Sequence, residues 1–265
     1  MDKNQNNIVL KTEKLSIGYV NRKKKTIVAK DINLNLKEKN LITVLGKNGI
    51  GKSTFLRTIA KVQNALSGSI FINQKNLESY TNRNISTLLS LVLTERLPES
   101  QLTVFELVAL GRQPYTNWID KLSDNDVEKI NIALQQTEIE HLQHKFFYEL
   151  SDGQLQRVLI ARALAQDTAI IILDEPTAHL DIHHTLKIFA LLKKLVQKTS
   201  KTIIISTHQV NLALQFSDNV ILFKDNKVIS GSIDELNNIN ALEDLFPDTI
   251  INYDTKLKQF VIKAN

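Results

Sequence analysis

The segment LITVLGKNGIGKST, residues 41–54, joins a fully apolar run to a loop with the pattern G-x-x-x-x-G-K-[ST]. The apolar residues 41–45 are typical of a buried strand, and TFLRTIAKV, residues 54–62, is compatible with a helix. Between a strand and a helix, such a loop can wrap phosphate oxygens with its backbone N–H groups. The sequence therefore predicts a nucleotide-binding loop at residues 46–54.

The side chains of this loop have separate tasks. Lys52 can reach the β- and γ-phosphates of a nucleotide, and the Ser53 hydroxyl can coordinate Mg²⁺. The residues predicted to contact the nucleotide here are Gly46, Asn48, Gly49, Gly51, Lys52, Ser53 and Thr54.

Two carboxylates follow another apolar strand, in IIILDEP, residues 170–176. Such a pair is often only the start of a loop, but beside a phosphate-binding loop Asp174 would hold Mg²⁺ and Glu175 would act as the general base on water. His208 also comes just past an apolar strand, and ligands gather at the carboxyl ends of parallel strands. Lys52, Glu175 and His208 are therefore the predicted catalytic residues, with His208 supporting the γ-phosphate.

From residue 169 onward, apolar runs alternate with helical patterns, which indicates βαβ units and a parallel sheet. Helices are expected at 182–198 and near 209–216. The residues before these show antiparallel alternation at the N-terminus, whereas residues 84–166 are predicted to be mostly helical. We expect one α/β domain with a helical insertion, followed by a short appendage that ends in a hairpin.

The composition is that of a globular protein, because 43% of the 265 residues are hydrophobic and 23% are charged. No apolar stretch approaches the ~20 residues that cross a bilayer, and the polar N-terminus lacks the apolar segment of a signal peptide. The chain has no cysteine, which excludes disulfides and thiolate metal sites. We therefore expect a cytoplasmic protein.

The net charge of +5 permits a polyanionic partner. The dense basic run from Arg22 to Lys25 lies between two strand-like segments, and we expect it to be a solvated hairpin turn. Aromatic residues do not alternate with basic ones as they do in a groove for single-stranded nucleic acid. No nucleic-acid partner is expected.

The segment ELSDGQLQRVLIARAL, residues 149–164, contains the start of a predicted helix. Ser151 and Gln154 have the S-x-x-Q spacing of a capping box, in which the two side chains satisfy free backbone N–H groups. The same helix start could instead receive an anion, because its N–H groups and the helix dipole favour negative charge. The spacing alone favours the cap and leaves the second role open.

In their order along the chain, these segments resemble the motifs of the nucleotide-binding subunits of ATP-binding cassette (ABC) transporters. The motifs are Walker A at 46–54, the signature LSDGQ at 150–154, Walker B at 170–175, the D-loop TAHLD at 177–181 and the switch histidine His208. The resemblance spans residues 8–235 and implies a Mg²⁺-dependent ATPase. It also implies an α/β fold: a P-loop NTPase core of RecA type with a parallel sheet, an N-terminal antiparallel β subdomain and a helical subdomain inserted at about 95–165. Residues 236–265 would form a C-terminal appendage.

The resemblance further implies a site shared between two subunits. In the family, two subunits pair head to tail, so that the signature helix of one meets the nucleotide bound to the other. The residues that the family pattern assigns to nucleotide contact in this way are Ser151, Gly153, Gln154 and Asp181. Tyr19 falls where the family has an aromatic residue that stacks on adenine, although taken alone it would be an ordinary strand residue. Capping and phosphate binding would then be two states of one helix start.

Two positions depart from the family pattern. Asp152 replaces the usual second glycine of the signature, and we expect its charge to point away from the nucleotide. The Q-loop glutamine, which contacts Mg²⁺ in the family, is missing from LVLTERLPES, where Thr94 and Glu95 occupy the expected place. Glu95 is therefore a candidate metal ligand beside Ser53 and Asp174.

A transporter built on this cassette would need a separate permease. Residues 102–126 resemble the helical subdomain of ATPases that serve importers of ferric siderophores, haem and cobalamin. In that region Pro114, Tyr115 and Trp118 either rim a groove for a permease helix or are buried packing. The resemblance implies a homodimer bound to a permease on the cytoplasmic face of the inner membrane and served indirectly by a substrate-binding protein. A soluble cassette ATPase acting on the ribosome or DNA, and a regulatory ATP-binding subunit without turnover, are the alternatives.

Overall fold

A six-stranded sheet forms the centre of the molecule, in the order β10-β9-β3-β8-β7-β6. The computed structural model describes residues 8–21, 24–94, 100–116, 121–224, 227–245 and 250–262. The strands of the central sheet are β3 (Leu41–Leu45), β6 (Leu89–Val92), β7 (Ile170–Leu173), β8 (Thr202–Ser206), β9 (Asn219–Lys224) and β10 (Lys227–Gly231). All of them run parallel except β10, which pairs antiparallel with β9 at one edge. The predicted parallel sheet is confirmed.

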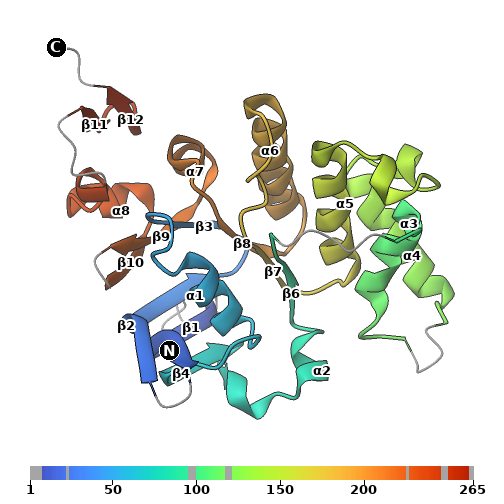
Figure 1. Ribbon diagram of the computed structural model, residues 1–265, viewed down its shortest axis with the longest axis horizontal. Helices are drawn as coiled ribbons and strands as arrows, with labels where there is room; N and C mark the ends of the chain where they lie inside the picture. Colours follow the sequence, from blue (N-terminus) through green and yellow to red (C-terminus); the bar gives the residue numbers. More distant parts are fainter. Residues whose placement is uncertain are drawn as a thin grey trace.

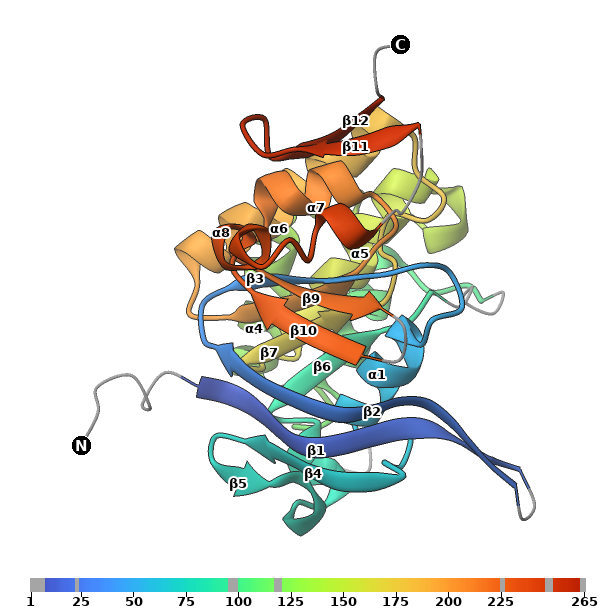
Figure 2. The ribbon, with the colours of Figure 1, turned by 90° about the vertical axis from the view of Figure 1, so that its left-hand side faces the viewer.

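Helices and strands cover this sheet on both faces, because successive residues of a strand point to opposite sides. Ile170 of β7 packs in the cluster that contains α1 (Lys52–Ile59) and the N-terminal strands. Ile171 packs in the cluster that contains α6 (Ile182–Lys198). Figure 2 shows the central sheet between these two layers. Burial on both faces explains why the strands are continuous apolar runs instead of alternating ones.

The N-terminal part of the chain forms a second, antiparallel sheet in the order β2-β1-β4-β5. Its strands are β1 (Ile8–Asn21), β2 (Lys24–Lys37), β4 (Ser67–Ile72) and β5 (Lys75–Asn76). Asn21 at the end of β1 pairs with Lys24 at the start of β2, as the hairpin predicted at the basic run requires. Arg22 and Lys23 lie outside the described residues. The short helices η2 (Leu77–Ser79) and α2 (Asn82–Ile85) lead from this sheet to β6.

The helical insertion lies to one side of the central sheet (Figure 1). Its elements are α3 (Val104–Ala109), η3 (Leu110–Arg112), α4 (Asp124–Gln136), η4 (Glu140–Leu142), η5 (Phe147–Glu149) and α5 (Asp152–Ala165). The prediction that residues 84–166 are mostly helical is wrong at its start, because Leu89–Val92 forms β6 and pairs with β7. Periodicity cannot distinguish a short apolar run in a buried strand from one in a buried helix. Here the run becomes a strand because it pairs with β7 in the folded sheet.

The last part of the chain packs against α7 (Val210–Phe216) and the edge of the central sheet (Figure 2). Its elements are α8 (Ile233–Asn238), η6 (Glu243–Leu245), β11 (Ile251–Asp254) and β12 (Gln259–Ile262). β11 and β12 form the antiparallel hairpin that the sequence predicts. The Asn211 side chain of α7 donates to the Phe260 carbonyl oxygen at 3.1 Å and accepts from the Phe260 N–H at 2.8 Å. Among the helices that the structure describes, none has the length and apolar character needed to cross a bilayer.

Candidate active site

The glycine loop has left-handed backbone positions, and at one of them a side chain would also clash with a neighbour. Gly51, directly before α1, has a left-handed φ of 115°, and a methyl group there would lie 2.1 Å from Cγ1 of Val28. Gly49 is also left-handed, with a φ of 76°. Glycine adopts such angles without steric cost, so the loop can turn tightly between β3 and the first turn of α1. The strand, loop and helix predicted around residues 46–54 are present.

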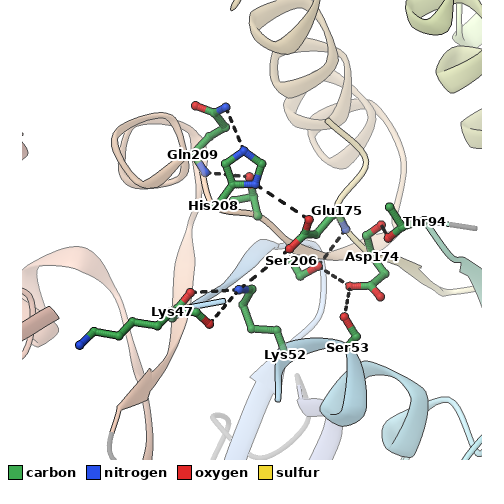
Figure 3. Close-up of polar contacts among 11 residues, drawn as sticks. Lys47, Lys52, Ser53, Thr94, Asp174, Glu175, Ser206, His208 and Gln209 are labelled. Atoms are coloured by element: carbon green, nitrogen blue, oxygen red, sulfur yellow. Dashed lines mark hydrogen bonds and ion pairs between the residues drawn. The ribbon is translucent and has the colours of Figure 1, made fainter. Parts of the chain in front are cut away.

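Lys52, the first residue of α1, is buried and bends back over this loop. Its Nζ donates to the carbonyl oxygens of Gly46 at 3.0 Å and Lys47 at 3.3 Å, and it lies 4.0 Å from Oε1 of Glu175 (Figure 3). Burial lowers the pKa of the Lys52 ammonium, while the carboxylates of Glu175 and Asp174 act in the opposite direction. A cation held in this way can face the phosphate oxygens that a loop of this kind binds.

Asp174 and Ser53 meet across the ends of β7 and α1. The Ser53 hydroxyl donates to Oδ1 of Asp174 at 3.0 Å, and the Asp174 side chain is only 4% exposed. Mg²⁺ prefers hard oxygen ligands and is commonly held by one or two carboxylates together with substrate phosphates, so this pair fits that ion. Among the described residues, no group of three or more His, Cys, Asp or Glu side chains could hold a metal. Ser53 and Asp174 are thus the two described side chains that fit this ion.

Glu175 lies between Lys52 and the switch histidine. Its Oε2 is 3.9 Å from Nδ1 of His208, and its Oε1 faces Lys52. His208 contacts Gln209 through its other ring nitrogen, at 3.4 Å between the two side-chain nitrogens. Figure 3 shows the three predicted catalytic residues converging from β7, β8 and α1. Carboxylate, imidazole and ammonium groups placed in this way can direct a water molecule at a bound phosphate.

Tyr19 of β1 lies beside the same loop. Its hydroxyl hydrogen bonds the Thr54 hydroxyl, although the two residues are 35 positions apart in the sequence. The side chain is 52% exposed, which leaves ring surface available for stacking on a base. Tyr19 is thus brought to the phosphate loop, and its contact with adenine stays a prediction.

The signature and the D-loop form helix starts of their own. Ser151 and Gln154 make the predicted capping box, since the Ser151 N–H donates to Oε1 of Gln154 at 3.1 Å and the Gln154 N–H donates to Oγ of Ser151 at 3.4 Å. Asp181 caps α6 by accepting from the His184 N–H at 2.8 Å. In the described part of the chain, the hydrogen bonds of these side chains do not involve Lys52 or its neighbours in the site. Asp152 is exposed in the first turn of α5, and its orientation relative to a nucleotide stays a prediction.

The departure from the family pattern at the Q-loop has a structural counterpart. The Thr94 hydroxyl donates to the backbone carbonyl oxygen of Asp174 at 2.8 Å, so this side chain holds the end of β7. Glu95, the candidate metal ligand, lies outside the described residues, as does Trp118. Tyr115 is 40% exposed, stacks on the Arg112 guanidinium and donates to the Gln166 carbonyl oxygen. It therefore combines packing with an exposed ring face.

Two hydroxyls hold the carboxylate pair in a way that the sequence did not predict: that of Thr94, which was expected only to stand in the place of the Q-loop glutamine, and that of Ser206. Thr94 follows β6, Ser206 ends β8, and these strands flank β7 on its two sides. The sequence does show a serine or threonine at the end of each of these apolar runs. Such a residue can be assigned to the site only when the strand order is known, because the order shows which strands are the neighbours of β7.

The fold and the site define a P-loop nucleotide-binding protein with a strand-end carboxylate pair and a histidine over the loop. Residues 29–178 match the family described as ABC transporter. The iron(3+)-hydroxamate import ATP-binding protein FhuC of Bacillus subtilis strain 168 is 35% identical over 241 residues, which cover 91% of this chain and 86% of that relative. The chain therefore belongs to the ABC transporter family, and it is an ATP-binding ATPase subunit of that family.

Two solved structures are similar over most of their length. One, described as a metal-chelate type ABC transporter in an inward-facing conformation, has a TM-score of 0.78 at 28% identity and covers 91% of this chain and 89% of that one. The dimeric bacterial ABC transporter cassette MJ0796 has a TM-score of 0.72 at 29% identity and covers 84% of this chain and 98% of that one. The likeness confirms the predicted α/β cassette with a parallel sheet, an antiparallel β subdomain and inserted helices.

Proposed function

We propose that this chain is the ATP-hydrolysing subunit of an importer for an iron chelate. The observation that carries the proposal is the convergence of Lys52, Glu175 and His208 around one glycine loop, in a chain that resembles an iron(3+)-hydroxamate import ATPase. A regulatory subunit without turnover has no need for a base and a histidine at this place. The chemistry of the site therefore favours hydrolysis over binding alone.

Each residue of the site has a proposed role. Lys52 neutralises the β- and γ-phosphates, Glu175 accepts a proton from the attacking water, and His208 holds the γ-phosphate and orients Glu175. Ser53 and Asp174 hold Mg²⁺, which would supply positive charge against the phosphate oxygens. Glu95 is a further candidate ligand on sequence grounds. Tyr19 stacks on the base, while the residues of the glycine loop at 46–54 hold the phosphates.

We further propose that the working unit is a head-to-tail dimer. The helix α5 begins at the signature residues Ser151, Gly153 and Gln154, and its N-terminal N–H groups and dipole suit a phosphate of the partner's nucleotide. Asp181 lies at the start of the next helix, α6. The similar cassette MJ0796 is dimeric. In this arrangement residues 8–235 form the ATPase domain, with the helical subdomain at about 95–165, and residues 236–265 form the appendage.

The proposed partners follow from the relatives. FhuC is an import ATP-binding protein for iron(3+)-hydroxamate. One of the two similar solved structures is described as a metal-chelate type ABC transporter. We place this chain on the cytoplasmic face of the inner membrane, against a separate permease that receives its cargo from a substrate-binding protein. No nucleic-acid partner is part of the proposal.

ATP turnover by the purified protein tests the enzymatic part. Lys52→Ala should lose ATP binding or turnover, and Glu175→Gln should bind ATP while turnover falls about a hundredfold or more. Lys11→Ala is the matched control, because Lys11 pairs with Glu13 on the exposed N-terminal sheet. With Mg-ATP, Glu175→Gln should accumulate as a dimer in light scattering. Turnover unchanged by Glu175→Gln would remove the general base from the mechanism.

Uptake by cells that lack this gene tests the transport part. Labelled ferric siderophores, haem and cobalamin are compared under iron limitation. Loss of one uptake, restored by the wild-type gene and not by Glu175→Gln, would establish the cargo class and its dependence on hydrolysis. Survival of all three uptakes would overturn the importer and return attention to a soluble ATPase on the ribosome or DNA.

A further inference from the structure

Ser206 is a fully buried residue whose hydroxyl contacts both members of the carboxylate pair. It is the last residue of β8 and is 0% exposed. Its Oγ lies 2.6 Å from Oδ1 of Asp174 and 2.8 Å from the backbone nitrogen of Glu175 (Figure 3). One short side chain thus links the proposed metal ligand to the backbone of the proposed base.

The direction of both hydrogen bonds is fixed by chemistry. The Glu175 N–H can only donate, so the Ser206 oxygen accepts from it. The single proton of the Ser206 hydroxyl is then free to donate to Oδ1 of Asp174, which also accepts from the Ser53 hydroxyl. The donor and acceptor capacities match without a water molecule, and the bond to the charged carboxylate is of the stronger kind.

The sheet places Ser206 where it can do this. β7 and β8 run parallel, with Leu173 opposite Ile205. The next residue after each of these, Asp174 and Ser206, therefore lies at the same carboxyl end of the sheet. Because β8 follows β7 only after α6, no local pattern brings these residues together. The contact is a product of strand order.

Glu175 needs such support because its backbone is unusual. Its φ of 47° is left-handed, a conformation that is sterically unfavourable for a residue with a Cβ and that persists where neighbours hold it. The Glu175 N–H is held by Ser206 at 2.8 Å, and its carbonyl oxygen accepts from the Ala178 N–H at 3.2 Å. These two bonds fix the peptide on each side of the base and aim its carboxylate at Lys52 and His208.

We propose that Ser206 is a positioning residue for ATP hydrolysis: its hydroxyl orients the Asp174 carboxylate toward Ser53 and holds the backbone of Glu175 in the conformation that presents the base. The proposal rests on the function proposed above. Ser206 acts through these two residues and needs no contact with nucleotide. Its loss should therefore affect turnover and the Mg²⁺ requirement much more than the affinity for ATP.

A matched pair of variants isolates the hydroxyl. Ser206→Thr and Ser206→Val add the same bulk, and only threonine keeps the oxygen. We expect Ser206→Val to lower kcat about ten- to hundredfold, the equivalent of a lost hydrogen bond to a charged group, and to raise the Mg²⁺ concentration needed for half-maximal turnover. The affinity for ATP should stay within about twofold, and Ser206→Thr should recover most of the lost rate.

Ser206→Ala serves as the second variant if the larger side chains disturb folding, and it should show the same split between kcat and ATP affinity. Ser217→Ala is the control, because Ser217 shares a buried hydrogen bond with the Thr43 hydroxyl away from the carboxylates. Its turnover should match that of the wild type. Equal kcat and Mg²⁺ dependence for Ser206→Val, Ser206→Ala and the wild type would overturn the proposal.

Glu175→Gln, measured in parallel, separates the two hypotheses. If that variant is inactive while Ser206→Val is normal, the proposed function stands and the positioning role is wrong. If Glu175→Gln keeps full turnover, the general-base assignment itself fails. A uniform loss of ATP affinity and stability in all Ser206 variants, without recovery by threonine, would mean that Ser206 only supports packing and would also overturn the proposal.

Discussion

Gly153 of the signature helix lies directly against the ring of His184 in α6. A methyl group on Gly153 would be 2.7 Å from Cδ2 of this imidazole, well inside contact distance. The ring is held in this place by Asp181, whose Oδ2 lies 2.8 Å from its Nδ1, and by a contact with the His183 ring. Packing within one subunit therefore favours glycine at position 153, in addition to the proposed contact with the partner's nucleotide.

Gly153→Ala should lower the free energy of unfolding by about 1–3 kcal/mol, because it overpacks this contact. Adding His184→Ala removes the obstacle, so the double variant should be more stable than the sum of the single effects predicts. A double-mutant cycle from denaturant unfolding measures this coupling. Strict additivity would contradict the steric explanation. If stability recovers in the double variant and turnover does not, Gly153 has the separate role at the nucleotide.

Tyr19→Phe should raise the KM for ATP about two- to tenfold, because it removes only the hydrogen bond to Thr54 and keeps the ring. Tyr19→Leu should raise the KM further, since it also removes the surface that stacks on adenine. Tyr148→Phe is the control, because Tyr148 is an exposed tyrosine near the signature. Steady-state ATPase assays give the comparison. A wild-type KM for both Tyr19 variants would remove this residue from the nucleotide site.

Asp126→Asn should lower stability at neutral pH by about 3 kcal/mol or more, because it breaks a buried ion pair. Oδ1 of Asp126 accepts from Nε of Arg112 at 2.8 Å, and both side chains are buried. Hydrogen bonds from Ser123 lower the pKa of Asp126, and Arg112 acts in the same direction. Its contribution to stability is therefore present above its ordinary pKa and is lost as the pH falls through the lower pKa of the folded protein.

Unfolding titrations between pH 7 and pH 3 check the sign. The difference between the wild type and Asp126→Asn should be largest at neutral pH and should shrink below about pH 4. Asp124→Asn, an exposed change in the same first turn of α4, should show little difference. A difference that grows as the pH falls would contradict the assigned direction of the pKa.

Asn211→Ala should loosen the C-terminal hairpin, because the Asn211 side chain makes two hydrogen bonds to the backbone of Phe260. With about 1 kcal/mol for each bond, local opening of β12 should become roughly ten- to thirtyfold more frequent. Hydrogen exchange of the β11 and β12 amides measures this opening. Asn252→Ala, at an exposed position of β11, is the matched control. Unchanged exchange in Asn211→Ala would show that apolar packing alone holds the hairpin.

Residues close together in the sequence made the nucleotide loop predictable. Gly51, Lys52 and Ser53 belong to one strand–loop–helix unit, whose geometry follows from local backbone preferences. The same holds for the cap at Ser151 and for the alternating elements after residue 169. Strand β6 was missed because an apolar run of its length has no periodicity of its own, and its pairing partner lies far along the chain.

The sequence by itself determined the family of this protein, its phosphate loop and the choice of Asp174, Glu175 and His208 as site residues. Each of these features belongs to a motif of consecutive residues. Only the tertiary structure decided that Tyr19 reaches Thr54, and that Thr94 and Ser206 hold the carboxylate pair from the two strands beside β7. The physical reason is that a parallel sheet brings strand ends together in an order set by burial and crossover connections. Residues separated by tens of positions then share hydrogen bonds that no local pattern records.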